Sequence, residues 1–300
     1  MFKYKVAVVQ SAPVLFDKSK TIEKIGRLID EAAAHGAELM LFPEVFIPGY
    51  PRGLSFGTVV GSRSNEGREL FLKYWENAIE VPGADTGLLG NMAKKAKAFL
   101  IIGVTEKDTI SDTLYCTLLY FRPDGKLIGK HRKIKPTAAE RILWGEGDGK
   151  DLEVYDTSHG KMGGLICWEN YMPLARNALY QQGIEIYLAP TADCRQSWQA
   201  TLEHISCEGR CYVLGCNQFV TKDDYPKEMQ NELSNQPDLM CSGGSVIFSP
   251  MGKLMAGPLF EKEGILYADI DHREIIKAKM DFDVIGHYAR PDIFEFRVKH

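Results

Sequence analysis

The stretch Gly164-Leu165-Ile166-Cys167-Trp168-Glu169-Asn170 places a thiol at the end of a short apolar strand. A helical pattern follows from about Pro173, and proline is tolerated in the first turn of a helix. Cys167 therefore lies between a strand and a helix, as in a nucleophile elbow, where backbone N–H groups can lower a thiol pKa and stabilise a developing anion. A buried structural cysteine is the alternative interpretation, and this pattern alone does not separate the two.

Two other strand ends also carry chemically active side chains. The apolar run Leu39 to Phe42 leads into Pro43-Glu44, and a hairpin strand leads into His131-Arg132-Lys133. Taken singly, Glu44 and Lys133 have the pattern of solvated surface residues. In α/β sheets, however, ligands bind just beyond the carboxyl ends of strands. A carboxylate there can take the proton of a thiol and an ammonium can stabilise an anion, so we expect both to meet Cys167 in one cavity.

Strand patterns and helical patterns alternate along the chain, which predicts an α/β fold with helices covering the sheets. The sequence contains no Ser/Gly-rich linker, low-complexity run or internal repeat, so we expect one domain over residues 1–300. The predicted helices cover Ile22 to Ala32, Leu88 to Ala98, Leu174 to Gln181 and Ser197 to Cys211. The predicted strands cover Val6 to Val9, Leu39 to Phe42, Leu100 to Val104, Leu114 to Phe121, Lys126 to Lys130, Gly164 to Ile166, Ile184 to Leu188, Val213 to Cys216, Ser245 to Ser249 and Ile265 to Asp269.

The composition is that of a globular protein, with 45% hydrophobic and 25% charged residues among 300. A net charge of −4 argues against nucleic acid or an anionic membrane as the partner, and the basic run Lys126 to Lys135 is short and isolated. We find no signal peptide and no apolar run near 18 residues, so we expect a cytoplasmic protein. The seven cysteines lack zinc-type spacing, so most are expected to be reduced thiols.

Several motifs, in order along the chain, resemble the nitrilase branch of the carbon–nitrogen hydrolase superfamily. The resemblance covers nearly the whole chain, from Val6 to Val246. Its most specific motifs are Phe42-Pro43-Glu44, His131 to Thr137 and Cys167-Trp168-Glu169-Asn170. Further motifs similar to nitrilases rather than generic amidases are Glu140-Arg141, Trp144 to Gly149 and Ala189 to Asp193, and Tyr50-Pro51-Arg52-Gly53 is close to plant and plant-like bacterial nitrilases.

The resemblance implies a four-layer α-β-β-α sandwich and hydrolysis of an organic nitrile to a carboxylic acid and ammonia. It implies Glu44 as general base, Lys133 as cationic stabiliser and Cys167 as nucleophile. Glu140 matches a second family glutamate that positions Lys133 or the substrate, and Asn170 completes the nitrilase form of the cysteine motif. It implies no metal and no organic cofactor. The expected partners are a small-molecule nitrile and further copies of the chain, in a homodimer or larger homo-oligomer.

Several residues near these motifs are candidates for the substrate pocket, although core packing is the alternative for each aromatic one. Trp168 is a supporting candidate, because its backbone N–H follows the nucleophile and can donate to an anionic intermediate. An aromatic wall would favour an aromatic or arylaliphatic nitrile, and a small polar nitrile such as β-cyanoalanine is the rival substrate. The pocket candidates are Tyr50, Thr137, Trp144, Asp193 and Trp198.

Two features depart from the family pattern. Cys194 follows Asp193 where relatives often carry a small residue such as glycine, so a second thiol can approach the site. The chain also ends soon after Phe294-Glu295-Phe296, whereas many nitrilases carry a longer tail that supports spiral filaments. This difference argues against filaments more than against dimers.

Other functions stay open on the sequence. An amidase or carbamoylase would use the same Glu-Lys-Cys machinery, and hydration of the nitrile to the amide can be a side or main reaction. A non-catalytic binding protein on the same fold would lack the three residues. A papain-like Cys-His protease would need His204 and Asn217 near Cys167, although no protease signature surrounds that cysteine.

Overall fold

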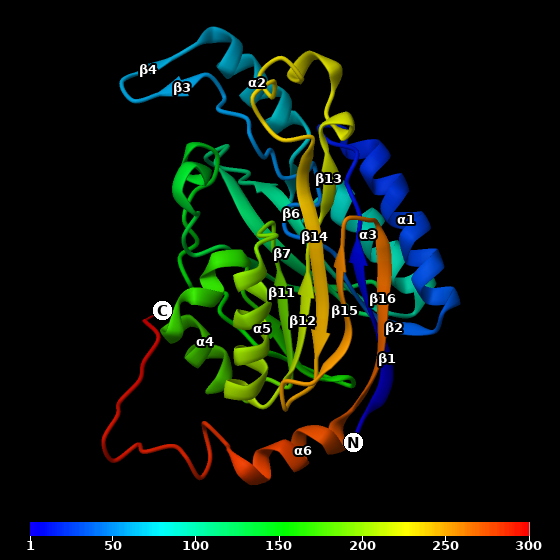
Figure 1. The fold of residues 1–300 in the computed structure, drawn as a ribbon, viewed down its shortest axis with the longest axis vertical. Coiled ribbons are helices and arrows are strands. Elements are labelled where there is room, and N and C mark those ends of the chain that lie inside the picture. The colour runs from blue at the N-terminus through cyan, green and yellow to red at the C-terminus, as the bar shows by residue number, and fades with distance from the viewer. Residues whose placement is uncertain (300) are drawn as a thin grey trace.

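Two β-sheets face each other in the computed structural model, which describes residues 1–299 (Figure 1). The strands of the first sheet lie in the order β16-β1-β2-β6-β7-β8, with β5 beside β6. Their bounds are β1 (Lys3–Gln10), β2 (Ala37–Leu41), β5 (Ile79–Glu80), β6 (Phe99–Lys107), β7 (Leu114–Phe121), β8 (Leu127–Arg132) and β16 (Gly264–Asp271). The second sheet has the order β13-β14-β12-β11-β10-β9, with β15 beside β14. Its strands are β9 (Tyr155–Thr157), β10 (Gly160–Gly164), β11 (Ile186–Pro190), β12 (Tyr212–Cys216), β13 (Phe219–Thr221), β14 (Leu239–Phe248) and β15 (Leu254–Phe260).

Helices cover the outer face of each sheet (Figure 1). Helices α1 (Lys18–Ala34) and α3 (Ala84–Ala96) pack on the first sheet, and α4 (Pro173–Tyr180) and α5 (Gln196–Gly209) pack on the second. Helix α2 (Asn65–Glu76) and the hairpin of β3 (Thr58–Val59) and β4 (Ser62–Arg63) lie at one end, and α6 (His272–Asp281) lies at the other. Short 3₁₀ turns cover Ala138–Ile142, Cys167–Tyr171, Lys222–Asp224 and Lys227–Met229.

Three buried clusters fill the three spaces between these layers. Ile25 on α1 lies in the cluster between the first sheet and the helices α1 and α3. Val8 lies in the cluster between the two sheets, and Leu202 lies in the cluster between the second sheet and the helices α4 and α5. Burying one such side chain stabilises the fold by roughly 1.5–3 kcal/mol. The predicted four-layer α-β-β-α sandwich is therefore confirmed.

The apolar stripe of α1 shows how local sequence sets this arrangement. Ile22, Ile25 and Ile29 recur at helical spacing and are all buried against the first sheet. The Asp17 side chain accepts a hydrogen bond from Lys20 N at 2.9 Å and so begins the helix. A charged residue at Ile25 would bury an unpaired charge in this cluster and break the contact between helix and sheet.

The predicted strands and helices are present, with boundary shifts that have local causes. β10 ends at Gly164 rather than Ile166, because Ile166 N donates to the Glu169 side chain at 2.6 Å instead of to a neighbouring strand. β14 begins at Leu239 rather than Ser245, since Gly243 and Gly244 have positive φ and interrupt the alternating pattern. Several elements were not predicted from the sequence, namely α2, α6, β3, β4, β5, β9, β13 and β15.

The order of the strands determines which chain segments can meet. β2 and β6 are parallel, and the two antiparallel steps from β6 through β7 make β8 parallel to β2. The residues after β2 and after β8 therefore leave the first sheet at the same edge. No helix among residues 1–299 is long and apolar enough to cross a bilayer. One domain over residues 1–300 stays a prediction, and His300 lies outside the described residues.

Candidate active site

The three predicted strand-end side chains are brought together between the sheets. Glu44 follows β2, Lys133 follows β8, and Cys167 begins a 3₁₀ turn after β10. Lys133 Nζ lies 2.7 Å from Glu44 Oε1, and both side chains are fully buried. The charges of both also act on the thiol, because Glu44 raises the pKa of Cys167 and Lys133 lowers it.

Glu44 is held by a loop that runs along β6. Phe42 N donates to Ile101 O at 2.9 Å, and Gly103 N donates to Pro43 O at 3.1 Å. A Cβ on Gly103 would lie 2.4 Å from Pro43 O and 2.7 Å from Glu44 Cα. Glycine at this position therefore allows the close approach that places the carboxylate.

The two oxygens of Glu44 have different surroundings. Oε1 accepts from Lys133 Nζ and from the Cys116 thiol at 3.6 Å. Oε2 is buried and has no hydrogen-bond partner among the described residues. Burial raises the pKa of Glu44, Lys133 lowers it and Glu140 raises it, and the net direction is upward. Oε2 is therefore a desolvated acceptor that is free to take a proton.

Lys133 lies between two carboxylates. Its Nζ is 2.8 Å from Glu140 Oε2 as well as 2.7 Å from Glu44. Burial by itself would lower the pKa of Lys133, but Glu44 and the other nearby acidic groups raise it well above its usual value. The lysine is therefore a fixed positive charge, and a charge of this kind can stabilise an anion.

Glu140 is oriented by two further groups. Oε2 accepts from Thr137 N at 2.6 Å, and Oε1 accepts from the Tyr50 hydroxyl at 2.7 Å. Thr137 and Glu140 also form a capping box at the start of the Ala138–Ile142 turn. The structure thus brings Tyr50, Thr137 and Glu140 together with Lys133.

Cys167 adopts a strained backbone conformation with a φ of 52°. A positive φ is uncommon outside glycine and persists only where surrounding contacts enforce it. Asn170 Nδ2 donates to Cys167 O at 2.8 Å and to Leu165 O at 2.9 Å, and the Tyr187 hydroxyl donates to Asn170 Oδ1 at 2.7 Å. These bonds hold the elbow that directs the sulfur toward the cavity.

The sulfur of Cys167 also has a direct polar partner. Thr191 Oγ1 donates to it at 3.1 Å. Burial raises the pKa of Cys167 and Glu44 raises it further, whereas Lys133 and the Thr191 hydroxyl lower it. The net shift is upward, so the resting sulfur is a neutral thiol.

A cavity of about 230 Å³ opens above Cys167. Trp168 lies at its wall, and its indole Nε1 donates to Asp193 Oδ2 at 2.9 Å. The predicted pocket residues Tyr50, Thr137 and Asp193 also line it. Its full lining is Tyr50, Arg52, Thr137, Glu140, Cys167, Trp168, Ala192, Asp193, Cys194 and Arg195.

Two predicted pocket residues lie elsewhere. Trp144 lines a neighbouring cavity of about 180 Å³ and packs against Tyr50, with ring centroids 5.7 Å apart. Trp198 lies on the buried face of α5, is only 1% exposed and belongs to the core cluster on the second sheet, where the partly exposed Tyr171 packs edge-on against it. Trp198 is therefore a core residue, because the helical register of α5 turns it toward the second sheet.

Three residues that lie at the site were not predicted from the sequence. Thr191 contacts the sulfur, Arg52 lines the cavity and donates to Ala192 O, and Cys116 contacts Glu44. Thr191 and Arg52 lie inside quoted motifs, so a signal was present for both. Cys116 lies in the middle of β7, where nothing distinguishes it from a core residue.

Cys194 lines the same cavity as Cys167 and is half-buried. A hydrogen bond from the Cys241 thiol is the main cause that lowers the pKa of Cys194, to about 5, and burial opposes the shift. Arg52 contributes to the lowering with its positive charge. A second, more acidic thiol therefore lines the same cavity as Cys167.

His204, the histidine that a Cys-His protease would need beside Cys167, does not lie at this site. His204 is exposed on α5 and lies 3.7 Å from Glu208 Oε1. Asn217 is buried and donates to Asp193 O and Gly243 O. His204 therefore contacts Glu208 at the surface rather than Cys167.

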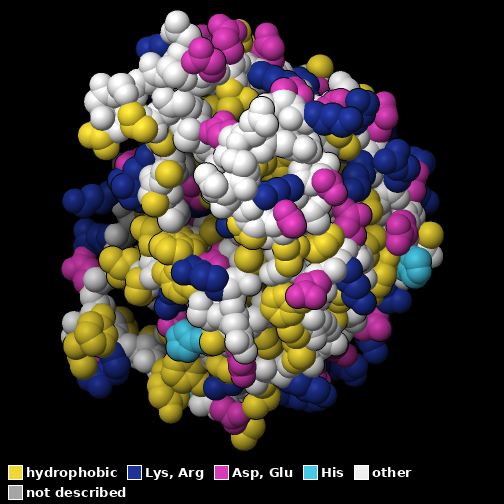
Figure 2. Space-filling model, turned by 45° about the horizontal axis from the view of Figure 1, so that its top comes forward, with side chains coloured by type: hydrophobic (Ala, Val, Ile, Leu, Met, Phe, Trp, Pro, Cys, Tyr) yellow, Lys and Arg dark blue, Asp and Glu magenta, His cyan; other side chains and the backbone are white. Residues whose placement is uncertain are grey.

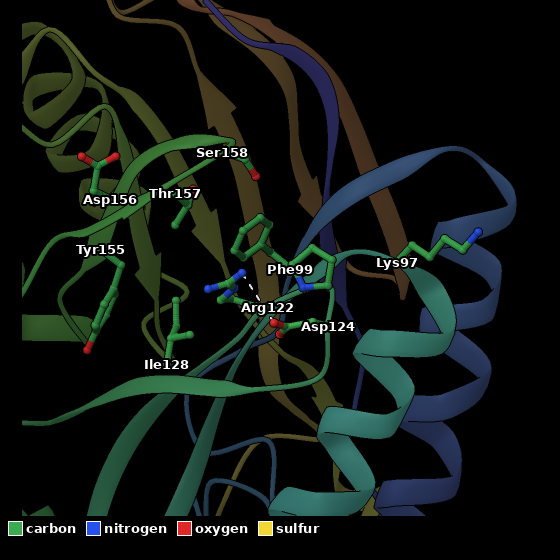
Figure 3. Close-up of a pocket in the computed structure, with 10 residues that line it drawn as sticks. Lys97, Phe99, Arg122, Asp124, Ile128, Tyr155, Asp156, Thr157 and Ser158 are labelled. Atoms are coloured by element: carbon green, nitrogen blue, oxygen red, sulfur yellow. Dashed lines mark ion pairs between the residues drawn. The ribbon is translucent and has the colours of Figure 1, made fainter.

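A larger cavity of about 640 Å³ lies at the opposite end of β8, where the β7–β8 turn faces β9 (Figure 3). Phe99 and Tyr155 line this cavity. An ion pair also lies there, with Arg122 Nη2 3.5 Å from Asp124 Oδ2. It contains no cysteine, so it lacks a thiol nucleophile. In the part of the chain that the structure describes, no three His, Cys, Asp or Glu side chains are grouped as ligands of a metal ion.

Comparisons with known proteins give relatives of this chain in sequence and in fold. The sequence model of the family described as carbon–nitrogen hydrolase matches residues 5–280. The chain is 51% identical over 300 residues to the bifunctional nitrilase/nitrile hydratase NIT4B of Nicotiana tabacum, covering 98% of this chain and 86% of that protein. It is 52% identical to an aliphatic nitrilase of Sinorhizobium fredii (strain HH103), covering 99% and 96%. The fold matches Saccharomyces cerevisiae Nit3, a member of branch 10 of the nitrilase superfamily, with a TM-score of 0.76 at 24% identity, covering 95% and 96%.

Proposed function

Since this chain belongs to the nitrilase branch of the carbon–nitrogen hydrolase family, we propose how it hydrolyses an organic nitrile to a carboxylic acid and ammonia. In this proposal Cys167 is the nucleophile, Glu44 the general base and Lys133 the stabilising cation. The observation that supports these roles is the buried contact between Lys133 Nζ and Glu44 Oε1 at 2.7 Å, directly beside the thiol that both charges influence.

The first step forms a covalent bond to the enzyme. Glu44 Oε2 takes the proton of Cys167 as the sulfur attacks the nitrile carbon. One C≡N π bond breaks, and its electron pair moves to nitrogen. The proton returned by Glu44 converts that nitrogen to the neutral thioimidate. Lys133 and the backbone N–H of Trp168 stabilise the negative charge while it exists.

Two waters complete the reaction. The first adds to the thioimidate carbon, and the C–N bond breaks as ammonia leaves, so a thioester remains on Cys167. The second water, deprotonated by Glu44, attacks the thioester carbonyl and releases the carboxylic acid, and the thiol regains its proton. Glu140 and Asn170 act as supports, since Glu140 holds Lys133 and Asn170 holds the cysteine turn.

The product ratio and the substrate side chain belong to the same proposal. Release of the tetrahedral intermediate with C–S cleavage instead of C–N cleavage gives an amide, and a tobacco relative is named for both activities. An amidase or carbamoylase reaction would use the same residues. The cavity wall combines Tyr50 and Trp168 with Arg52 and Asp193, so an aromatic nitrile and a small polar nitrile such as β-cyanoalanine both stay candidates.

The experiment is a panel of aromatic, arylaliphatic, aliphatic and amino-acid nitriles, each with its matching amide, assayed for ammonia, acid and amide. We expect ammonia and acid from at least one nitrile. The Cys167→Ala variant should release none, and Cys211→Ala, which removes a buried thiol from the core outside the site, should retain activity. Ammonia from amides alone would favour the amidase alternative, and wild-type turnover by Cys167→Ala would refute the proposed nucleophile.

We also propose the cytoplasm as the compartment and a homodimer or larger homo-oligomer as the assembly. All seven cysteines are free thiols, which suits a reducing compartment. Large apolar side chains are exposed next to each other at Tyr171, Met172 and Leu174, and Phe294 is also exposed. Figure 2 shows such side chains gathered on the left of the molecule, over α4 and the C-terminal segment. Patches of this kind often mark contacts between proteins, and light scattering would give the oligomer size.

A further inference from the structure

Glu169 lies two residues after the nucleophile and is 1% exposed. Its Oε2 accepts from Ile166 N at 2.6 Å, and its Oε1 accepts from Ile134 N at 2.6 Å. Ile166 directly precedes Cys167, and Ile134 directly follows Lys133. One buried carboxylate therefore holds the backbone beside both of these residues.

His131 completes this arrangement from the β8 side. Its Nε2 lies 3.0 and 3.1 Å from the two Glu169 oxygens, and its Nδ1 lies 3.0 Å from Asp151 Oδ1. Asp151 Oδ2 in turn accepts from Arg132 N at 2.7 Å. With a carboxylate at each ring nitrogen, both nitrogens are donors and the ring is an imidazolium. Burial alone would lower the pKa of His131, but Glu169 and Asp151 raise it to about 10.

None of these three side chains lines the cavity above Cys167. They lie behind the two loops that present the reacting groups, so they do not touch substrate. The strained φ of Cys167 needs enforcement from outside, and a bond to Ile166 N supplies it on the N-terminal side. The second anchor, at Ile134, fixes the loop of Lys133 to the same carboxylate.

We propose that Glu169, His131 and Asp151 form a clamp that sets the distance between the Cys167 sulfur and the Lys133 ammonium. They are positioning residues for the nitrilase reaction, and this inference rests on the function proposed above. Reacting groups must be held in attack geometry, and a misplacement of about 1 Å can lower a rate by roughly 100-fold. The clamp supplies this geometry for two loops that belong to different sheets.

The test compares variants that remove single parts of the clamp. Glu169→Gln keeps the side-chain shape but removes the charge and one acceptor. His131→Gln keeps a donor toward Glu169, whereas His131→Leu keeps none. The matched control is Glu106→Gln, because Glu106 is a buried carboxylate that holds Arg132 and Thr117 on the strands and neither loop. Each variant is measured for melting temperature, for kcat and KM, and for the rate at which iodoacetamide alkylates the Cys167 peptide by mass spectrometry.

We expect Glu169→Gln to lower kcat per folded enzyme by about 100-fold with KM within about threefold, and to slow alkylation of Cys167. His131→Gln should retain clearly more activity than His131→Leu. Glu106→Gln should have a lower melting temperature than the wild type but the same kcat and alkylation rate. Wild-type kcat and alkylation in Glu169→Gln, or equal losses in Glu106→Gln, would overturn the clamp. If no nitrile is turned over, the proposed function fails, and the alkylation rates still decide on the clamp.

Discussion

Replacement of Lys133 by alanine tests the electrostatic design of the site most directly. At 2.7 Å and an effective dielectric constant near 20, the attraction between the ammonium and Glu44 is about 6 kcal/mol before desolvation is counted. Without this attraction, the pKa of Glu44, which burial already raises, rises further, so the carboxyl holds a proton more readily and is less available as a base.

The loss of activity combines two effects. A lost anion donor costs about 100- to 1,000-fold, and a lost general base costs about 100- to 10,000-fold. The rate losses caused by groups that act as a unit are smaller together than their product. We therefore expect the single-turnover rate of Lys133→Ala to fall by at least about 1,000-fold. The affinity for a neutral nitrile should change little, because the ammonium stabilises charge that is absent from the free substrate.

The same variant leaves Glu44 and Glu140 buried without their cation. Breaking a buried ion pair costs about 3–5 kcal/mol, which should lower the melting temperature by roughly 10 °C. A carboxyl whose folded pKa is raised contributes stability below its unfolded pKa and loses it as pH rises through the folded pKa. The loss of folding stability in Lys133→Ala, relative to the wild type, should therefore be smaller at pH 5 than at pH 8.

The assay is a rapid-mixing single-turnover measurement with whichever nitrile the panel identifies. Formation of the acyl-enzyme is followed by mass spectrometry. Lys135→Ala is the matched control, since Lys135 is an exposed lysine two residues away that pairs with Glu146 at the surface. Its rate and melting temperature should match the wild type. If Lys133→Ala stays within tenfold of the wild-type rate, the electrostatic reasoning is wrong.

Three further predictions concern groups around the same centre. Thr191→Val removes the hydroxyl that donates to the Cys167 sulfur, so alkylation of that thiol should slow by about tenfold while Thr191→Ser stays near wild type. The pKa of Glu44 is raised by burial, so the acid limb of kcat/KM should lie above the usual glutamate pKa of 4.5; a limb at or below that value would contradict Glu44 as the base. Tyr50→Phe frees Glu140 Oε1 and should lower kcat by about tenfold, with unchanged kcat as the contrary result.

The sequence predicted that Glu44, Lys133 and Cys167 meet, because their meeting depends on the directions of the strands that they follow. Short-range sequence patterns indicate those directions. The Asp124-Gly125 hairpin reverses the chain, so β8 runs parallel to β2 and its end reaches the same edge. The motif resemblance added the four-layer fold, which strand patterns alone do not determine. Both kinds of signal concern backbone order rather than side-chain orientation.

What the sequence did not predict depends on orientation and on packing between layers. Trp198 and Trp144 look alike as aromatic residues near motifs, yet the register of α5 buries Trp198 in the core. Thr191 reaches the Cys167 sulfur only because β11 lies beside β10, and Glu169 reaches Ile134 only because the two sheets pack face to face. Contacts between segments so far apart leave no periodic signal in either segment.

The pKa directions also determine how the proton moves. Burial raises the pKa of Cys167 and of Glu44 alike, so the resting site holds a thiol and not a pre-formed thiolate. The proton must then leave sulfur as the carbon–sulfur bond forms, and Glu44 Oε2 has no hydrogen-bond partner among residues 1–299 that the proton would displace. Two carboxylates around one ammonium carry a formal charge of −1, so the extra proton is held readily on Glu44. The nitrile nitrogen must gain protons before ammonia can leave. A buried carboxyl that keeps the proton it took from sulfur can return that proton to the nitrogen. The positive charge of Lys133 then favours the ionised form of Glu44, so the carboxylate can accept a proton from the next water.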